Sequence, residues 1–360
     1  MAKYNLKKSN EVKNQRSILL FESGIKAKAT LKAYTNSLDQ FLKFSKVHDY
    51  DSLIDLEPKQ IQIIIEDFLM VCKRKYRYGS IDNIFSAIQL FFTMNDVMLN
   101  FKKIRKMFPE REKPYGDKPY TTEDVKLLLD QTKTLKFKAL IYLLSSSGVR
   151  AGAVHELQVK DLKDMGHGCK ALTVYPNTIA EYHTFISPEC VKSFDVYFEQ
   201  RKKKGEKITE NSYLFLTDRD TKFCPEYVSI TMCRLALKLH DRKKTGLRYD
   251  KMASHGIRKR WDTILKMRHD VNINLVEKMI GHSRTIPLDN VYFKPTLEQL
   301  FSEYLKALPD LMIDETLKLK DELEKKDNEI EMLKRNQDER ILLLEAQHKE
   351  IAEHIKNLKS

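Results

Sequence analysis

The stretch "SHGIRKRW", residues 254–261, places His255 and Arg258 three residues apart at the start of a segment with helical periodicity. Residues three apart lie on one face of a helix, and the first turn of a helix carries partial positive charge. We expect Ser254 to cap this helix, so that the histidine and the arginine face one side near its positive end. Such an arrangement suits an anion.

Three further polar residues extend this pattern along the chain. Arg150 follows Gly148 in "SSSGVRAGAVHEL", His282 lies in "MIGHS", and Tyr292 lies in "DNVYFKP". Two arginines from separate segments could clamp one phosphate, because guanidinium is planar, charged and bidentate toward phosphate. A tyrosine that attacks phosphorus needs such charge stabilisation and a nearby proton acceptor. Taken singly, each residue is more often an ion-pair partner, a helix cap or packing, so the pattern depends on their joint order.

The motifs "SSSGVRAGAVHELQVKDL", "SHGIRKRW", "MIGHS" and "DNVYFKP" resemble those of the tyrosine recombinases, also called the phage-integrase family, in order and in approximate separation. The resemblance covers nearly all of residues 20–310, because the helical first part of the chain is similar to that family's core-binding domain. It implies an enzyme that cuts and rejoins DNA strands through a 3′-phosphotyrosyl bond and releases a 5′-hydroxyl.

The resemblance also implies a role for each motif residue. Tyr292 would be the nucleophile, and Arg150 and Arg258 would clamp the scissile phosphate. His255 and His282 would handle protons and hydrogen-bond that phosphate. The implied partner is double-stranded DNA, and the implied assembly is a homo-oligomer on DNA, a tetramer in the family.

Two positions depart from the family's pattern. The family usually has an acidic residue three positions after its first arginine, where this chain has Ala153, although Glu156 lies close in sequence. The family's lysine in the turn of the catalytic hairpin corresponds to Ile179 in "PNTIAE". Lys170, at the start of the preceding strand, is the nearest substitute and becomes the candidate general acid. A solvated lysine on a strand edge is the alternative.

Composition and charge indicate the class of partner. The 360-residue chain has a formal charge of +13 and a pI near 9.2, which favours a polyanion, nucleic acid before a membrane surface. No apolar run approaches the length that spans a bilayer, and the first residues lack the apolar middle of a secretion signal. We expect no membrane association and a cytoplasmic protein that lies with the DNA, in the nucleoid if the source is prokaryotic.

Cysteines and carboxylates give no sign of a metal site. The five cysteines are odd in number and form no CxxC pair, so neither a disulfide framework nor a zinc knuckle is indicated. No carboxylate cluster with ligand spacing lies near the motifs, so the sequence predicts neither a metal nor a cofactor. We expect all five cysteines to be small, mostly buried hydrophobes. They are Cys72, Cys169, Cys190, Cys224 and Cys233.

The periodicity predicts a mainly α protein with a small antiparallel sheet, an α+β fold. It divides the chain into an all-helical DNA core-binding domain and a catalytic recombinase domain, joined by a linker rich in proline and charge. The predicted ranges are 1–24 for a polar N-terminal arm, 25–108 for the core-binding domain, 109–120 for the linker, 121–312 for the catalytic domain and 313–360 for a helical, coiled-coil-like tail.

In the first domain, four segments have the spacing of one helical face: "KATLKAYTNSLDQFLKFSKVH", "PKQIQIIIEDFLMVCKRKY" opening on Pro58, "SIDNIFSAIQLFFTMND" capped by Ser80, and the short basic "NFKKIRKMF". Basic segments such as "KKIRK" and "RKKKGEK" would contact DNA phosphates without reading sequence. The predicted DNA-binding residues are Lys102, Lys103, Arg105 and Lys106.

In the second domain, "FKALIYLLSSSGVRAGAVHEL" indicates a buried helix interrupted near Gly148. The segments "KALTVY" and "YHTFIS" predict a hairpin around "PNTIAE", and "SYLFLT" predicts a short strand. Further helices are expected at about 188–203, 225–240, 255–269 and 273–280.

The tail contains no glycine or proline and is dense in helix formers. With Leu323 at heptad position a, later a positions fall on Ile330, Gln337, Leu344, Ile351 and Leu358. The d positions are Leu319, Leu333 and the polar Lys326, Arg340, Gln347 and His354. This pattern favours a weak or conditional coiled coil, and a solvated single helix is the alternative.

The function that the sequence favours is a site-specific recombinase or integrase. A type IB topoisomerase-like enzyme, which nicks and closes DNA without pairing two sites, is one alternative. A DNA-binding protein with a decayed active site is another, and Ala153 and Ile179 are the features that support it.

Overall fold

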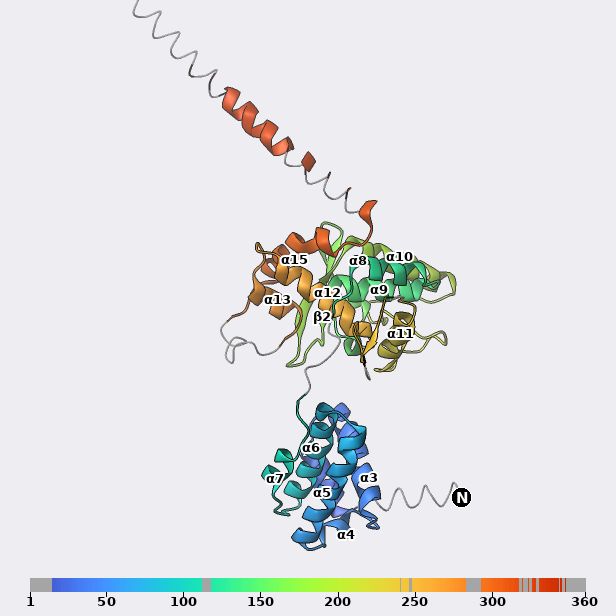
Figure 1. Cartoon of the computed structure of the whole chain (residues 1–360). Coiled ribbons are helices and arrows are strands. Elements are labelled where there is room, and N and C mark those ends of the chain that lie inside the picture. The colour runs from blue at the N-terminus through green and yellow to red at the C-terminus, as the bar shows by residue number, and fades with distance from the viewer. Residues whose placement is uncertain are drawn as a thin grey trace, which may run out of the picture. The chain divides into compact units, whose positions relative to one another are not determined.

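Two compact units make up the chain, Met1–Pro114 and Tyr115–Ser360 (Figure 1). Their boundary falls inside the segment that was expected to be a linker. The computed structural model describes residues 15–111, 118–239, 241–245, 248–282 and 293–316, and after these 319, 323, 326–327, 330–342, 344 and 347.

All regular secondary structure among the described residues of the first unit is helical, and its helices form where one face can be buried. Apolar side chains of α3, α5 and α6 recur at three- and four-residue intervals and meet in a core rich in phenylalanine. Pro58 occupies the first turn of α5, where its missing N–H costs nothing. The helices are α2 (Arg16–Ser23), α3 (Lys28–Ser45), α4 (Tyr50–Ile54), α5 (Pro58–Lys75), α6 (Tyr78–Met94) and α7 (Phe101–Lys106).

Two local predictions for this unit are wrong. Helix α6 begins before the expected Ser80 cap, and its N-cap is Arg77, whose side chain makes no capping bond. The polar arm is shorter than expected, because α2 lies within it and buries Ile18 and Phe21 in the first core. A helix of two turns has too few periodic positions to stand out in a sequence.

The second unit is built of helices around a small antiparallel sheet, so the predicted fold class is confirmed. Its longer helices are α8 (Thr122–Asp130), α9 (Leu135–Ser147), α10 (Pro188–Lys203), α11 (Tyr227–Ala236), α12 (Ala253–Met267), α13 (Ile273–Met279) and α15 (Leu297–Leu311). Short 3-10 turns are η1 (Ala151–Ala153) and η2 (Val159–Asp161). The strands are β1 (Leu162–Gly166), β2 (Cys169–Val174) and β3 (Tyr182–Ile186), with a separate pair β4 (Lys244–Thr245) and β5 (Arg248–Tyr249).

The sheet follows the sequence in part. Strands β2 and β3 form the expected hairpin, and β1 adds an unexpected third strand in the order β1-β2-β3. The strand predicted at "SYLFLT" is wrong, because Tyr213 and Leu216 make only isolated bridges among the described residues. The predicted linker is also too long at its C-terminal end, since Tyr120 is buried in the second unit's core.

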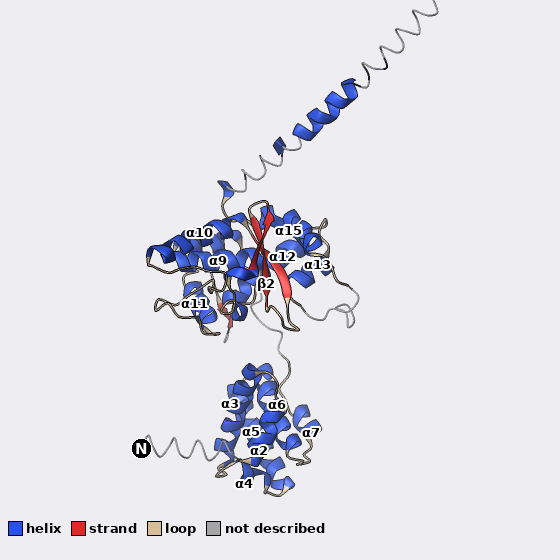
Figure 2. Ribbon diagram, turned by 180° about the vertical axis from the view of Figure 1, so that it is seen from behind, coloured by secondary structure: helices blue, strands red, loops and turns tan. Residues whose placement is uncertain are grey.

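The three-stranded sheet separates two cores. Leu172 and Val174 of β2 face the core that α9 dominates, while Cys169 and Ala171 face the core around α15. Figure 2 shows α9, α10 and α11 on one side of the sheet and α13 and α15 on the other, while α12 contributes side chains to both cores. A strand buried on both faces fixes the sheet between helices that come from distant parts of the chain.

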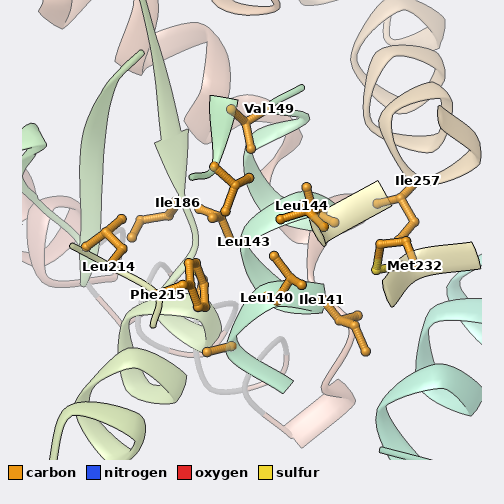
Figure 3. Close-up of a cluster of buried hydrophobic side chains, with 14 of the residues drawn as sticks. Leu140, Ile141, Leu143, Leu144, Val149, Ile186, Leu214, Phe215, Met232 and Ile257 are labelled. Atoms are coloured by element: carbon orange, nitrogen blue, oxygen red, sulfur yellow. The ribbon is translucent and has the colours of Figure 1, made fainter. Parts of the chain in front are cut away.

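Helix α9 is the most buried of the unit's described α-helices. Figure 3 shows Leu140 and Leu144 between Phe215 on one side and Met232 and Ile257 on the other. Nearly every side chain from Ala139 onward is buried, which explains why its sequence is an apolar run without a polar face.

Outside the cores, the described tail residues beyond 314 are helical and exposed, including Leu323, Ile330 and Leu344. Coiled-coil pairing of the tail stays a prediction. Cys224 and Cys233 are exposed, so the expectation of buried cysteines is wrong for these two. Among the described helices, none is long and apolar enough to cross a membrane.

Candidate active site

The site begins where α9 ends. Gly148 closes this helix with a φ of 60°, a conformation that costs glycine least. A Cβ atom at this position would lie 2.8 Å from the Trp261 ring, so the close approach of α12 also requires glycine. Arg150 follows at once, just before η1.

The last carbonyls of α9 find partners on other elements. The Ser146 carbonyl accepts hydrogen bonds from Trp261 Nε1 at 2.8 Å and from the Tyr304 hydroxyl at 3.0 Å. The Ser147 carbonyl accepts one from Thr184 Oγ1 at 2.7 Å. Because the final carbonyls of a helix lack intrahelical partners, side chains from α12, α15 and β3 take their place. These bonds fix the position at which the chain leaves α9.

Helix α12 carries the second arginine. The predicted Ser254 cap is wrong, because the helix begins at Ala253 and its N-cap is Met252, which makes no side-chain capping bond. His255 and Arg258 still lie three residues apart in the first turns, on one face. His255 is exposed, whereas Arg258 is only 7% exposed.

The ends of two helices hold the Arg258 guanidinium. Its Nη1 donates to the Gly148 carbonyl at 2.5 Å, and its Nη2 donates to the Ile280 carbonyl at 2.5 Å. Ile280 follows α13, so the cation lies at the negative C-terminal ends of both α9 and α13. Burial, and after it the charge of Arg150, lowers the pKa of Arg258.

The Arg150 side chain also reaches the backbone that follows α13. Its Nη2 donates to the Gly281 carbonyl at 2.9 Å, and this residue directly follows the one that binds Arg258. Its guanidinium carbon lies 6.0 Å from the centroid of the Tyr182 ring. Each guanidinium has five N–H groups, so the carbonyl bonds leave donors on both side chains for an anion.

His282 comes next in the chain, and Glu277 holds its ring. The imidazole Nδ1 lies 2.7 Å from a Glu277 carboxylate oxygen, and Lys266 forms an ion pair with the same carboxylate. A carboxylate only accepts, so Nδ1 carries the hydrogen and Nε2 is left for another partner. Burial raises the pKa of Glu277, but the bonds from Lys266 and His282 outweigh burial and lower it.

The predicted nucleophile, Tyr292, lies outside the described residues. Tyr304, the next tyrosine along the chain, is fully buried, and its hydroxyl bonds the Ser146 carbonyl. Burial raises the pKa of Tyr304 well above its ordinary value. It is therefore a packing residue and no alternative nucleophile.

Comparison with known proteins identifies the family. The model of the phage integrase family matches residues 119–298, half of the 360-residue chain. The chain belongs to the phage integrase family. The predicted membership of the tyrosine recombinases is thus confirmed.

Two relatives carry the name tyrosine recombinase XerC. The one from Caldanaerobacter subterraneus subsp. tengcongensis is 26% identical over 150 residues, 40% of this chain and 37% of the relative. The one from Thermodesulfovibrio yellowstonii is 23% identical over 297 residues, 78% of this chain and 90% of the relative.

Solved structures share the fold. The Tn1549 transposon integrase in complex with transposon right end DNA matches with a TM-score of 0.55 and 15% identity, over 81% of this chain and 99% of that chain. The XerH recombinase bound to difH substrate, in a post-cleavage complex, matches with a TM-score of 0.53 and 16% identity, over 71% and 73%. A lambda integrase dimer bound to a core site matches with a TM-score of 0.53 and 14% identity, over 79% and 99%.

This member of the phage integrase family departs from the family's usual motif at two positions, Ala153 and Ile179. Ala153 is buried, and the Glu156 carboxylate lies 3.4 Å from His155 Nε2. Ile179 stands fully exposed in the hairpin turn.

Lys170 lies at the wrong end of the hairpin for a general acid. It pairs with Ile186, while Val174 pairs with Tyr182 beside the arginines. The two pairs are four residue steps apart along the strand, which is about 13 Å at the rise of a β-strand. This exceeds the reach of a lysine side chain, so the structure does not bring Lys170 to the arginine pair.

Several residues of the two basic segments form ion pairs within the protein. On α7, Lys103 pairs with Glu66 at 2.6 Å and Arg105 pairs with Asp82 at 2.7 Å. Lys102 and Lys106, also predicted to bind DNA, are exposed. In "RKKKGEK", Arg201 is buried and bonds Glu206 and two backbone carbonyls, so this arginine supports the fold instead of facing DNA.

Two residues at the site escaped the sequence analysis. Glu277 stands five residues before His282, a spacing that could have drawn attention to it. Tyr182 gave no signal, because a tyrosine that opens a strand is common. Among the described residues, no group of three or more His, Cys, Asp or Glu side chains is placed to hold a metal ion.

Proposed function

We propose that the protein is a site-specific DNA recombinase that cleaves and rejoins strands through a 3′-phosphotyrosyl intermediate. One observation carries this proposal: Arg150 and Arg258 come from separate elements and bond the carbonyls of the consecutive residues Ile280 and Gly281. Two guanidinium groups so placed suit the non-bridging oxygens of one phosphate. Membership of the phage integrase family supports the same chemistry.

The proposed reaction is a transesterification. The Tyr292 hydroxyl oxygen attacks phosphorus and gives up its proton, and the bond from phosphorus to the 5′ oxygen breaks. The bond to the 3′ oxygen remains, so the phosphate stays on the 3′ end as a phosphotyrosine, while the 5′ oxygen takes up a proton. Rejoining reverses these steps with a 5′-hydroxyl as the nucleophile. Negative charge grows on the phosphate oxygens in each transition state, where the two arginines stabilise it.

The histidines complete the proposed site. His282, held at Nδ1 by Glu277, can offer Nε2 to the phosphate or to a proton in transit. His255, exposed on the face of α12 that carries Arg258, has the position for a second such contact. The general acid for the 5′ oxygen is left open in this proposal, because Lys170 is too far along its strand.

Duplex DNA is the proposed partner. The net charge of +13 and the exposed Lys102 and Lys106 of the first unit favour phosphate contacts that do not read sequence. A homo-oligomer on DNA, a tetramer as the family implies, belongs to the proposal, and the protein would lie with the DNA in the cell.

The test is covalent capture. The full chain is mixed with a pool of nicked duplexes of random sequence. Cleavage near the nick releases a short strand, which cannot rejoin, so any phosphotyrosyl product is trapped. Denaturing electrophoresis then detects the covalent adduct. The wild-type protein should form an adduct, also in excess EDTA because side chains supply the charge stabilisation. Tyr292→Phe should form none while duplex binding in a mobility-shift assay is kept. An adduct of equal yield from the Tyr292→Phe variant would refute the assignment.

Strand exchange then separates recombination from simple nicking and closing. Two copies of the captured site on one plasmid should yield a deletion or inversion. Relaxation of supercoils without exchanged products would favour a type IB topoisomerase-like activity. Tight duplex binding without any adduct would favour a DNA-binding protein with a decayed site.

A further inference from the structure

Tyr182, the first residue of β3, lies against Gly281 and beside Arg150. A Cβ atom on Gly281 would lie 2.5 Å from its ring carbons, so only glycine at 281 leaves room for the ring. The Arg150 guanidinium lies 6.0 Å from the ring centroid, and the hydroxyl is close enough to Arg258 to affect the pKa of that arginine. The Tyr182 side chain is 8% exposed.

The Tyr182 hydroxyl lacks an acceptor within the described part of the chain. Its oxygen is buried and makes no hydrogen bond among the described residues, although Arg258 is near enough for the hydroxyl to influence the pKa of that arginine. Arginine offers only donors, so neither guanidinium can accept the hydrogen of this hydroxyl. A buried donor without an acceptor costs free energy. An anion between the arginines would supply the missing acceptor.

We propose that Tyr182 is a third phosphate-binding residue, whose hydroxyl donates a hydrogen bond to a non-bridging oxygen of the phosphate that Arg150 and Arg258 clamp. The inference rests on the proposed function in taking this phosphate to be that of DNA. Tyr182 and Arg258 are 8% and 7% exposed. The Tyr182 ring packs against Gly281, whose carbonyl accepts the hydrogen bond from Arg150. The contact is neutral, so it orients the phosphate without adding a third positive charge.

Tyr182 also stands close to the hairpin position at which the family has its lysine. It follows the hairpin turn in which Ile179, fully exposed, stands at the position of the family's lysine. The hairpin of this chain thus still brings one donor to the arginine pair, from the strand instead of the turn.

Tyr182→Phe is the informative variant, because it removes the hydroxyl and keeps the ring against Gly281. Tyr120→Phe is its matched control. The Tyr120 hydroxyl is also buried and has no partner in the segments that the structure describes, and its ring packs against Gly256 as closely as Tyr182 packs against Gly281. Both variants should melt at the wild-type temperature or above it, since each loses an unpaired buried hydroxyl.

Inorganic phosphate gives a readout that needs neither DNA nor turnover. Thermal unfolding at rising phosphate and constant ionic strength yields the affinity through ligand linkage. Tyr182→Phe should weaken phosphate binding by about tenfold to a hundredfold, as expected for one hydrogen bond to a charged group. Tyr120→Phe should bind phosphate with the affinity of the wild type. Arg150→Gln, which removes one arginine of the proposed clamp, should bind phosphate more weakly. Equal affinity in the wild type and Tyr182→Phe would overturn the proposal.

Cleavage distinguishes phosphate binding from proton donation. On a suicide duplex, Tyr182→Phe should form covalent product about tenfold to a hundredfold more slowly than the wild type. The defect should be equal on DNA with sulfur at the 5′-bridging position, because a thiolate leaves without a proton. A defect that disappears on the sulfur substrate would replace the proposed contact with proton donation to the leaving group. Absence of any wild-type adduct would refute the recombinase function, while the phosphate affinities would still decide the role of Tyr182.

Discussion

At the residue scale, backbone carbonyls explain how two like charges stay together. Arg150 and Arg258 lie close enough for the charge of one to lower the pKa of the other, yet the carbonyls of Gly148, Ile280 and Gly281 hold them in place. The arginines are therefore positioned before any ligand binds, which is the condition for effective transition-state stabilisation. A phosphate would relieve their repulsion.

Glu277 ties the site to protein stability at low pH. Its folded pKa is lowered below the ordinary 4.5, so its interactions stabilise the fold above that value and are lost as the pH falls through the lowered pKa. We predict that Glu277→Gln flattens this part of the profile: the free energy of unfolding, measured with urea from pH 6 to pH 3, should fall less steeply than in the wild type. Parallel curves would contradict this account.

The matched control is Glu156→Gln, which removes a carboxylate whose side chain is 52% exposed and whose partner is His155. Exposed pairs contribute little to stability, so this variant should follow the wild-type curve. The same two variants also separate positioning from packing. Glu277→Gln should slow DNA cleavage by weakening the hold on His282, whereas Glu156→Gln should not.

At the scale of elements, the junction of α9 and α12 decides where both arginines stand. Trp261 of α12 packs on Gly148 and bonds the Ser146 carbonyl, and Arg258 one turn earlier bonds the Gly148 carbonyl. A shift of α12 against α9 would therefore move Arg258 away from Arg150.

We predict that Gly148→Ala is strongly destabilising. The left-handed backbone at Gly148 should cost about 1–2 kcal/mol with a side chain, and the clash with Trp261 should add about 1–3 kcal/mol. Gly166→Ala is the control, because Gly166 has a φ of 79° but no neighbouring atom of the structure within 4 Å of the added Cβ. Urea unfolding of both variants isolates the clash as their difference. Equal losses of unfolding free energy in the two variants would show that the Trp261 side chain moves aside without cost.

The sequence predicts elements well where local pattern decides them. Apolar periodicity located α3, α5 and α10, and the Ser-Gly sequence after an apolar run located the end of α9. The pattern did not predict α15, although Thr296 and Gln299 form a capping box at its start, a few residues after the Tyr292 motif. Tyr182 and Glu277 were missed for a different reason: their significance depends on contacts with Arg258 and His282 that only the folded chain creates.

At the scale of the whole molecule, the described part of the tail exposes apolar side chains. Leu323, Ile330 and Leu344 occupy the a positions of the heptad pattern and are about half exposed or more. The first residues of the predicted tail are anchored, because the Ile313 and Asp314 backbone N–H groups bond the Glu189 carboxylate. A second copy of the chain is the partner that a heptad stripe suits.

We predict that deletion of residues 319–360 leaves single-site cleavage and the melting temperature unchanged but weakens multimer formation. The double variant Leu323→Lys with Ile330→Lys should weaken it as well while keeping the full length. Sedimentation on and off DNA measures the effect. Identical sedimentation of the wild type, the deletion and the double variant would show that the tail is a solvated helix.

The central claim is that Tyr292 is the nucleophile of this chain, and mapping the covalent linkage tests it most directly. The adduct trapped on a suicide duplex is digested with protease and nuclease, and mass spectrometry identifies the residue that carries the nucleotide and the end of the strand to which it is joined. The account predicts a 3′-phosphate on Tyr292 as the sole linkage. A nucleotide on any other residue, or a linkage to the 5′ end of the strand, would contradict it.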